Sequence, residues 1–111
     1  MGEVIFLYVT APGEAAITAM ADTLVTEGLA ACVNILPRIR SVYRWKGAIE
    51  RSEEAAMIVK TTEALADKAR RRLEHLHPYE TPVIAAFSVV AARSGGGFLN
   101  WMACELSETI S

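Results

Sequence analysis

The stretch that most constrains the fold runs from residue 31 to residue 62, where two strand-forming segments flank the pair Lys46-Gly47. Glycine in such a short connection supplies the positive φ angle of a tight turn, so the stretch predicts one long β-hairpin. On the first strand, apolar residues take odd positions and basic residues take even ones, which is typical of a half-buried strand. The odd set is Val33, Ile35, Ile39, Tyr43 and Trp45, and the even set includes Asn34, Arg38, Arg40 and Arg44.

A two-residue turn also predicts which residues of the two strands face each other. It places Arg40 opposite Glu53, and Arg44 close to Glu50 on the diagonal. Opposite charges at cross-strand positions favour this register over its alternatives.

The length of the hairpin predicts contact with another molecule. Each strand of about fifteen residues would extend roughly 45–50 Å, whereas a compact chain of this size has a radius of gyration of only about 13 Å. The hairpin should therefore bend at Pro37, project from its domain, or both. A projecting tip would expose Tyr43 and Trp45, which a monomer rarely tolerates. Because 52% of the residues are hydrophobic, we expect this surface to pack on another copy of the chain.

Periodicity predicts the elements on either side of the hairpin. Residues 4–9 and 83–90 are apolar runs typical of buried strands. Apolar residues spaced three and four apart predict helices over 14–27, 63–76 and 98–106. The resulting order, β-α-β-β-α-β plus a helix, predicts an α+β chain of one domain. Its fold would be ferredoxin-like, an antiparallel sheet with a long central hairpin and a C-terminal helix.

Composition excludes several classes of partner. The net charge of -2 creates no field that would draw the chain to nucleic acid, and no apolar stretch is long enough to span a bilayer. Two cysteines are too few for a disulfide framework, so we expect reduced thiols in the cytoplasm. The residues before the first strand contain no basic segment and no cleavage site, so no signal peptide is expected.

The polar loop over residues 77–82 is the strongest candidate site, because prolines at both ends stiffen it. Imidazole suits copper, zinc and nickel, and a carboxylate is a plausible companion, so His77 and Glu80 are candidate metal ligands. His75 adds an H-x-H pair at the end of the helix. The alternative, which spacing alone favours, is that His77 and Glu80 cap that helix and hydrogen-bond the loop.

Other candidates carry competing interpretations. Cys32 is a conceivable thiolate ligand, although free cysteine is more often a buried packing residue. Arg38 and Lys60 suit either a bound anion or a solvated face paired with glutamates. Tyr43 and Trp45 suit either a stacked planar ligand or, more commonly, an anchored interface. The sequence contains no nucleophile–base motif, phosphate-cradling glycine loop or Cys-x-x-Cys, so an enzyme is not expected.

Six segments along the chain carry a recognisable pattern: Thr10-Ala11-Pro12, Leu29-Ala30-Ala31-Cys32-Val33-Asn34, Ser41-Val42-Tyr43-Arg44-Trp45-Lys46-Gly47, Ile58-Val59-Lys60-Thr61-Thr62, His77-Pro78-Tyr79-Glu80-Thr81-Pro82 and Phe98-Leu99-Asn100-Trp101. In the same order and over nearly the whole chain, these segments resemble the CutA divalent-cation tolerance family. That resemblance implies a ferredoxin-like fold, a compact homotrimer with hairpins packed edge to edge, and tolerance to copper and other divalent metals. Tyr43, Trp45 and Trp101 are then the expected interface anchors.

The resemblance also implies where copper would bind. In enteric bacterial members, the proposed ligands are a cysteine before Thr-Ala-Pro and two histidines before Pro-Tyr. The corresponding positions here are Val9, Leu76 and His77, so His77 alone keeps a ligating side chain. We therefore expect a cytoplasmic homotrimer that binds copper(II) or another divalent cation at His77. Glu80 and Cys32 are its further candidate ligands.

Two other functions are compatible with this sequence. By fold-level analogy, the chain could be a PII-like trimeric regulatory module that binds a small molecule in intersubunit clefts. Arg38, Lys60 and Tyr79 would line such a cleft. A third hypothesis is a structural protein whose assembly is itself the function.

Overall fold

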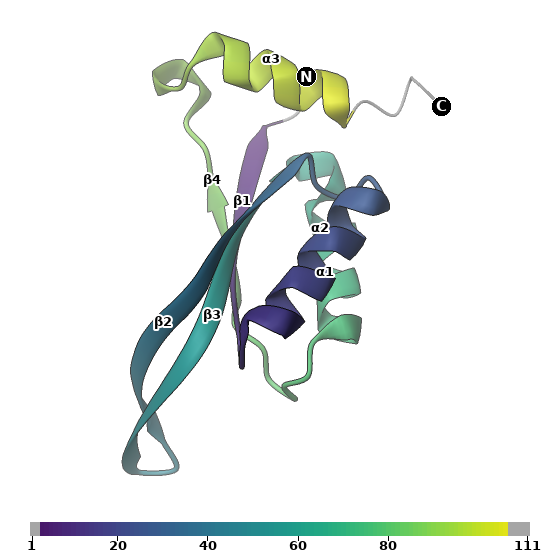
Figure 1. The fold of residues 1–111 in the computed structure, drawn as a ribbon. Coiled ribbons are helices and arrows are strands. Elements are labelled where there is room, and N and C mark those ends of the chain that lie inside the picture. Colours follow the sequence, from purple (N-terminus) through teal and green to yellow (C-terminus); the bar gives the residue numbers. More distant parts are fainter. Residues whose placement is uncertain (1–2, 107–111) are drawn as a thin grey trace.

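The computed structural model describes residues 3–106, which form four strands, three α-helices and one short 3₁₀ helix (Figure 1). The predicted order of elements is confirmed. In chain order they are β1 (Val4–Ala11), α1 (Glu14–Thr26), β2 (Cys32–Trp45), β3 (Ala48–Thr62), α2 (Glu63–Leu76), β4 (Ile84–Ser88), η1 (Ala91–Arg93) and α3 (Gly96–Glu105).

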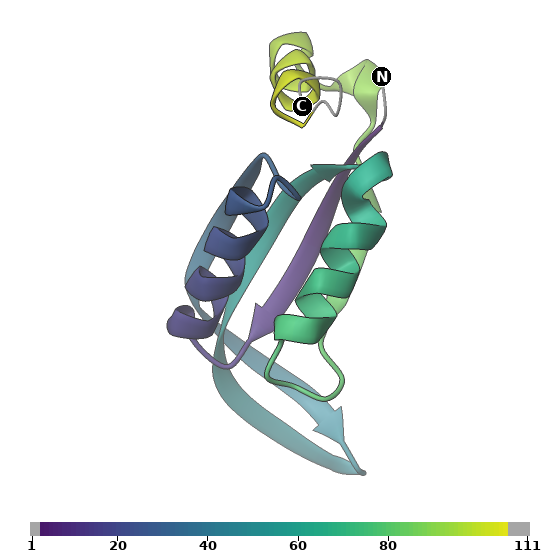
Figure 2. The same ribbon diagram turned by 90° about the vertical axis from the view of Figure 1, so that its right-hand side faces the viewer.

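The four strands form one sheet in the order β2-β3-β1-β4, and every neighbouring pair is antiparallel. Figure 2 shows α1 and α2 side by side across one face of this sheet. The predicted ferredoxin-like α+β fold is therefore confirmed. The opposite sheet face, which we call the open face, carries neither of these two helices.

The core lies between the sheet and the two helices. Alternate residues of β1 and β3, such as Leu7 and Met57, point toward the helices and are almost fully buried. From the helices, Ile17, Leu24 and Leu73 close the same cluster at 0% exposure. Burying each such side chain contributes about 1.5–3 kcal/mol. The apolar faces that the sequence periodicity predicts for the strands and helices thus pack together into a single continuous core.

Just after helix α1, the chain reverses at a glycine in the left-handed region. Gly28 has a φ of 73°, a conformation that is strained for residues with a Cβ. The Gly28 amide donates to the Val25 carbonyl at 3.1 Å, and the Leu29 amide donates to the Leu24 carbonyl at 2.8 Å. This hydrogen-bond pair is the Schellman motif, which reverses the chain toward β2.

The hairpin of β2 and β3 turns at Lys46 and Gly47, whose φ angles are 49° and 83°. Two positive φ angles make this the type I′ turn that fits the twist of a hairpin. Arg40 lies opposite Glu53, as predicted. The predicted irregularity at Pro37 is also confirmed, since the register shifts between Leu36 and Ile39.

That register shift corrects one prediction. Between Leu36 and Ile39 the first strand advances three residues while its partner advances two, which adds one unpaired residue and reverses the facing. Val33 therefore faces the helices with Val59, whereas the odd positions after the bulge face the other side. The single apolar stripe predicted along the whole first strand is thus wrong beyond Pro37. Independently of the bulge, the turn register places Arg44 opposite Ile49, while Glu50 lies opposite Tyr43, so the predicted proximity of Arg44 and Glu50 on one face is wrong.

Residues 38–54, which we call the arm, extend past the rest of the sheet (Figures 1 and 2). Strand β1 pairs with β3 only as far as Ala11 opposite Ala55, so the arm has only its own hairpin pairing within residues 3–106. The molecule measures 47 × 29 × 21 Å and has a radius of gyration of 14.9 Å. The predicted projection is confirmed.

The C-terminal elements differ modestly from prediction. Strand β4 is shorter than the apolar run 83–90, and the short 3₁₀ helix η1, which was not predicted, follows it. Helix α3 lies at the end of the sheet farthest from the tip of the arm (Figures 1 and 2). It attaches through Met102, which is fully buried, and through Phe98, whose ring meets Phe6 edge-on at 6.4 Å. Helix α3 therefore covers only one end of the open face.

Candidate functional site

His77 follows directly after α2 and has both of its ring nitrogens engaged. Its side chain is only 8% exposed. Nε2 lies 2.7 Å from the carbonyl oxygen of Thr10, and the Tyr79 amide donates to Nδ1 at 3.0 Å. A carbonyl can only accept and an amide N–H can only donate, so the proton of the neutral ring sits on Nε2.

The strand register explains why an imidazole is held here. The ladder between β1 and β4 ends at Val9 opposite Ile84, so the Thr10 carbonyl lies beyond its last pair. His77 supplies the donor for that carbonyl. The following Pro78 disfavours helical geometry, and His77 accordingly is extended, with a φ of −71° and a ψ of 136°. The sequence therefore ends the helix at the point where the ring can reach β1.

This arrangement resembles the surroundings of a metal-bound histidine. Ligating histidines almost always donate their second ring N–H to a carboxylate or backbone carbonyl, which fixes the tautomer and orients the ring. In His77 that role belongs to Nε2–H, which leaves Nδ1 as the atom with a lone pair. Nδ1 can therefore serve a cation once the Tyr79 amide has left it.

Tyr79 also reaches the base of the arm. Its hydroxyl donates to the Glu54 carboxylate on β3 at 3.1 Å, and its ring centroid lies 5.1 Å from that of His77. Burial raises the pKa of the Tyr79 phenol above its ordinary value, and the hydrogen bond to Glu54 and the negative charge of that carboxylate act in the same direction. The phenol is therefore kept in its protonated, hydrogen-bond-donating form.

The residues predicted to hold a cation are not gathered in one place. Cys32 and Phe6 both lie opposite Lys60, on either side of β3. Phe6 is four residues along β1 from Thr10, the residue that His77 contacts, so Cys32 is displaced from the His77 ring by roughly 13 Å along the strand direction. Glu80 lies in the same loop as His77 and is exposed. Within residues 3–106, no three His, Cys, Asp or Glu side chains are placed to hold a metal together.

The residues predicted for an anion cleft are also divided. Arg38 is paired with Glu53, to which its Nε donates at 3.1 Å. Because Tyr79 bonds the next residue, Glu54, these two predicted cleft residues lie near the same end of the arm. The Lys60 ammonium instead lies 5.7 Å above the rings of both Phe6 and Phe98, toward the opposite end of the sheet.

Two functional candidates were missed at the level of sequence. Thr10 contributes only a backbone carbonyl, so no side-chain pattern points to it. Charge alone does not distinguish Glu54 from the other glutamates of the hairpin, although its position beside the apolar run that starts at Ala55 is a usable signal. A carboxylate at the boundary between an exposed arm and a buried strand lies where other elements of the fold can reach it.

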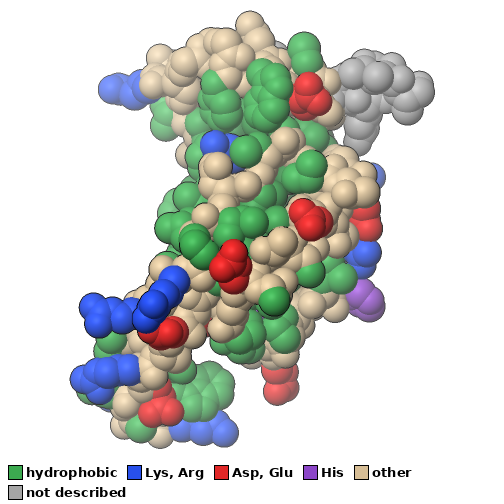
Figure 3. Space-filling view, viewed as in Figure 1, with side chains coloured by type: hydrophobic (Ala, Val, Ile, Leu, Met, Phe, Trp, Pro, Cys, Tyr) green, Lys and Arg blue, Asp and Glu red, His purple; other side chains and the backbone are tan. Residues whose placement is uncertain are grey.

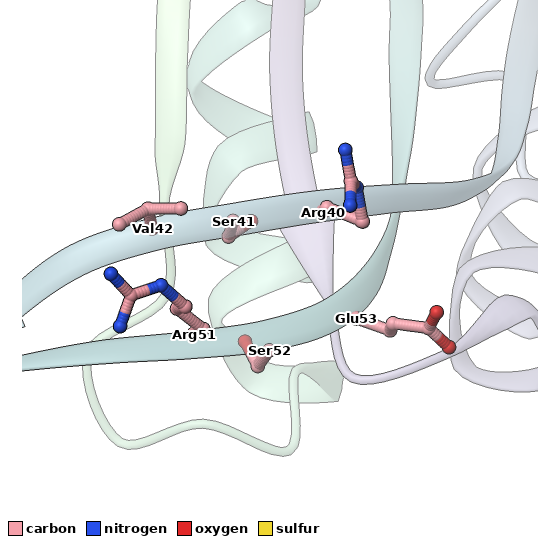
Figure 4. A pocket seen from close by; sticks show the side chains of 6 residues that line it. All are labelled: Arg40, Ser41, Val42, Arg51, Ser52 and Glu53. Carbon is pink, nitrogen blue, oxygen red and sulfur yellow. The ribbon is translucent and has the colours of Figure 1, made fainter.

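The predicted interface residues are exposed in the single chain. Trp45 is 56% exposed, and Tyr43 and Trp101 are each 43% exposed. Lys and Arg side chains gather on the arm among hydrophobic ones (Figure 3). Along the arm runs a hollow of about 640 Å³, in which residues of β2 lie across from residues of β3 (Figure 4). Its lining is Arg40, Ser41, Val42, Arg51, Ser52 and Glu53.

The open face carries a second, apolar hollow of about 360 Å³, lined by Phe6, Tyr8, Ile58 and Phe87. Phe87 is 58% exposed there. Both hollows are distinct from the His77 loop. Among the helices within residues 3–106, none combines the length and the apolarity needed to cross a membrane.

Comparison with known proteins places this geometry in a family. Residues 5–105 match the family model described as CutA1 divalent ion tolerance protein. The divalent-cation tolerance protein CutA of Thermus thermophilus is 39% identical over 102 residues, which cover 92% of this chain and 95% of the relative. Protein CutA of Mus musculus is 34% identical over 110 residues, and the match covers 99% of this chain but 60% of that longer protein.

Solved structures agree in fold. The crystal structure of CutA1 from Oryza sativa superposes with a TM-score of 0.90 at 34% identity, covering 96% of each chain. CutA1 from Ehrlichia chaffeensis gives a TM-score of 0.89 at 31% identity and covers 96% of this chain and 98% of its own. The chain therefore belongs to the CutA1 divalent ion tolerance protein family.

Proposed function

We propose that this chain is a cytoplasmic, homotrimeric divalent-cation-binding protein that serves metal tolerance and catalyses no reaction. Copper(II) is the proposed cation, because imidazole is a ligand that copper favours. The family's name, divalent ion tolerance, supports the class of ligand. His77 is the proposed centre of binding.

The observation that carries this proposal is the hydrogen bond from His77 Nε2–H to the Thr10 carbonyl at 2.7 Å. It orients the ring and commits Nδ1 to accepting. Glu80, three residues along the same loop, is the proposed second ligand. Within one chain Cys32 lies too far along the sheet to share this centre, so its proposed contribution is made across a subunit boundary.

Exposed apolar surface supports the proposed assembly. The arm presents Tyr43 and Trp45, α3 presents Trp101, and the open face presents its apolar hollow. Aromatic residues of this kind commonly anchor protein interfaces. The resemblance to the CutA family supplies the number three.

The free thiols of Cys32 and Cys104 support the proposed cytoplasmic location, since reduced cysteines suit a reducing compartment. The names of two relatives carry other compartments, with a rice protein called chloroplastic and the Archaeoglobus fulgidus structure called periplasmic. Localising a tagged full-length chain in its own cell tests this part of the proposal, which predicts recovery in the cytosolic fraction.

The PII-like alternative has less support from the geometry. Of the three residues that would line an anion cleft, Arg38 and Tyr79 already hold carboxylates. Lys60 lies six residues along β3 from Glu54, roughly 20 Å away. A bound anion would therefore find Arg38 and Tyr79 already hydrogen-bonded to carboxylates, and it would find the Lys60 ammonium far from both of them.

Calorimetric titration tests the cation proposal directly. Copper(II) is added to metal-stripped protein in a buffer that does not bind copper, using the wild type and the variants His77→Asn and His75→Asn. The chain's two histidines form a matched pair, because His75 is exposed on the last turn of α2 and His77 is buried. We expect saturable binding that is weakened at least about tenfold by His77→Asn and kept by His75→Asn.

Asparagine at position 77 can still accept from the Tyr79 amide, so an unchanged melting temperature would show that the loop remains folded. Equal copper affinities for wild type and His77→Asn would contradict the proposal. Heats that never saturate would contradict it as well.

A further inference from the structure

The backbone amide and the side-chain hydroxyl of Tyr79 each donate a hydrogen bond, and the two acceptors belong to different parts of the molecule. Its amide donates to His77 Nδ1 at 3.0 Å, and its hydroxyl donates to the Glu54 carboxylate at 3.1 Å. His77 follows α2, whereas Glu54 lies on β3 where the arm leaves the sheet. One residue thus links the candidate ligand to the base of the arm.

We propose that Tyr79 is a positioning residue that couples the arm to His77, withholding Nδ1 for as long as Glu54 holds its hydroxyl. This inference rests on the proposed function, because it concerns the regulation of the same site. We call the pair of hydrogen bonds made by Tyr79 the latch.

The geometry makes the two ends of the latch interdependent. Nδ1 has a single lone pair in the ring plane, so it cannot accept from the Tyr79 amide and serve a cation at the same time. Freeing it requires the backbone at Tyr79 to move. Pro78 and Pro82 restrict the backbone on either side, so that movement also carries the tyrosine ring away from Glu54.

Because the latch and cation binding compete for Nδ1, thermodynamic linkage sets the direction in which each changes the other. An interaction that stabilises the latched loop lowers the affinity of Nδ1 for a cation, and cation binding weakens that interaction equally. The arm also bears the aromatic residues proposed for the subunit interface. A shift of the arm that moves Glu54 away from Tyr79 would therefore raise cation affinity at His77.

Two variants remove the hydroxyl bond from opposite sides. Tyr79→Phe deletes the donor and keeps the amide, and Glu54→Ala deletes the acceptor. Each should tighten copper(II) binding about threefold to tenfold in the calorimetric assay. The reason is that the hydrogen bond between the Tyr79 hydroxyl and Glu54 no longer helps to hold the Tyr79 amide on His77 Nδ1. The double variant should gain no more than either single one, because both remove the same interaction.

Matched controls come from the same chain. Tyr8→Phe alters a tyrosine on the open face, and Glu53→Ala alters the neighbouring glutamate, which pairs with Arg38 instead. Both controls should bind copper(II) as the wild type does. Glu54→Gln keeps an acceptor for the hydroxyl and should restore affinity toward the wild-type value.

A spectroscopic measurement separates the latch from a general change in stability. Nitrogen-15 spectra of the imidazole rings should report the Nε2–H tautomer of His77 in the wild type and in Tyr79→Phe. Zinc(II), which is diamagnetic, should shift the Nδ1 signal at a lower concentration in Tyr79→Phe than in the wild type. The exposed His75 provides the internal reference.

The outcomes are distinguishable. If His77→Asn loses binding while Tyr79→Phe and Glu54→Ala bind as the wild type does, the latch is overturned and the proposed function stands. If Glu54→Ala weakens binding, Glu54 acts as a ligand and the latch is overturned. If His77→Asn binds as the wild type does, the proposed function and this inference fail together.

Discussion

The arm and the rest of the molecule, which we call the body, satisfy their apolar residues in different ways. In the body, Leu7, Met57 and Leu73 are buried between the sheet and two helices. In the arm none of residues 38–54 is buried, although Val42 and Ile49 are as apolar as core residues. Val42 is 65% exposed and Ile49 is 56% exposed.

The contrast separates residues whose burial stabilises the folded chain from residues that the folded chain leaves exposed. Core residues of the body find their partners within the chain. The arm gains only one hairpin ladder and leaves both of its faces open, which is marginal for an isolated two-stranded ribbon. Its aromatic and aliphatic side chains are therefore exposed in the single chain, as are those around the apolar hollow on the open face of the body.

The largest effect should come from a cavity in the body. Leu73→Ala removes a side chain with 0% exposure at the centre of the core. We expect the free energy of unfolding to fall by about 2–5 kcal/mol, as measured by chemical denaturation at a fixed protein concentration. Val25→Ala, at a position that is 45% exposed on α1, should change it by only about 0.5 kcal/mol. Similar losses for the two variants would show that the body is not closed as described.

A smaller effect, on assembly rather than folding, is expected from the tip of the arm. Trp45→Ala should weaken subunit association by on the order of 2 kcal/mol, because truncating a buried interface anchor commonly costs that much. Dissociation is followed by sedimentation over a dilution series. Arg71→Ala, an exposed residue of α2, is the control and should cost only about 0–1 kcal/mol. Identical dissociation midpoints would place the tip of the arm outside the interface.

A pH effect should appear where the arm meets the body. The pKa of Tyr79 is raised above 10.0, so its contribution to stability is complete below that pH and is lost as the phenol ionises in the folded state. We expect wild-type stability to fall more steeply above pH 10 than that of Tyr79→Phe, as followed by melting temperature. Parallel melting curves for the two proteins up to strongly alkaline pH would contradict this assignment.

The smallest effect should lie wholly on the surface of the body. Arg72 on α2 holds Glu27 through two hydrogen bonds of 2.9 Å, and this lowers the pKa of Glu27 below its ordinary value of 4.5. The stabilisation is present above that pH and disappears as Glu27 becomes protonated at lower pH. Glu27→Gln should therefore be slightly less stable than the wild type at neutral pH and equal to it in strong acid. A difference that persists in acid would mean that the ion pair is not its cause.

The sequence predicted local elements better than their combination. The apolar runs, the helical spacing of apolar residues and the turn at Lys46-Gly47 were sufficient to predict the order of elements and the fold class. Pro37 marked the site of the bulge, but periodicity could not reveal that one inserted residue reverses the facing of every later side chain. The prediction for Arg44 failed for a different reason: the register set by the turn places Glu50 opposite Tyr43, on the other face of the hairpin from Arg44.

The candidate site depended on contacts that no spacing encodes. His77 stood out in the sequence, yet the state of its ring follows from where the β1–β4 ladder ends, which leaves the Thr10 carbonyl for Nε2–H. Likewise, the link from Tyr79 to Glu54 joins residues 25 positions apart on different elements. Such a contact becomes visible only when the register of the whole sheet is known.

The most direct test of the proposed assembly is its mass in solution, measured on the wild type by native mass spectrometry and by sedimentation at micromolar concentration. We propose that the arm contacts other copies of the chain in a homotrimer. The expected mass is therefore three times the 12.1 kDa mass of one chain. A particle of one chain throughout that concentration range would contradict it, because the exposed surface of the arm would then have no partner.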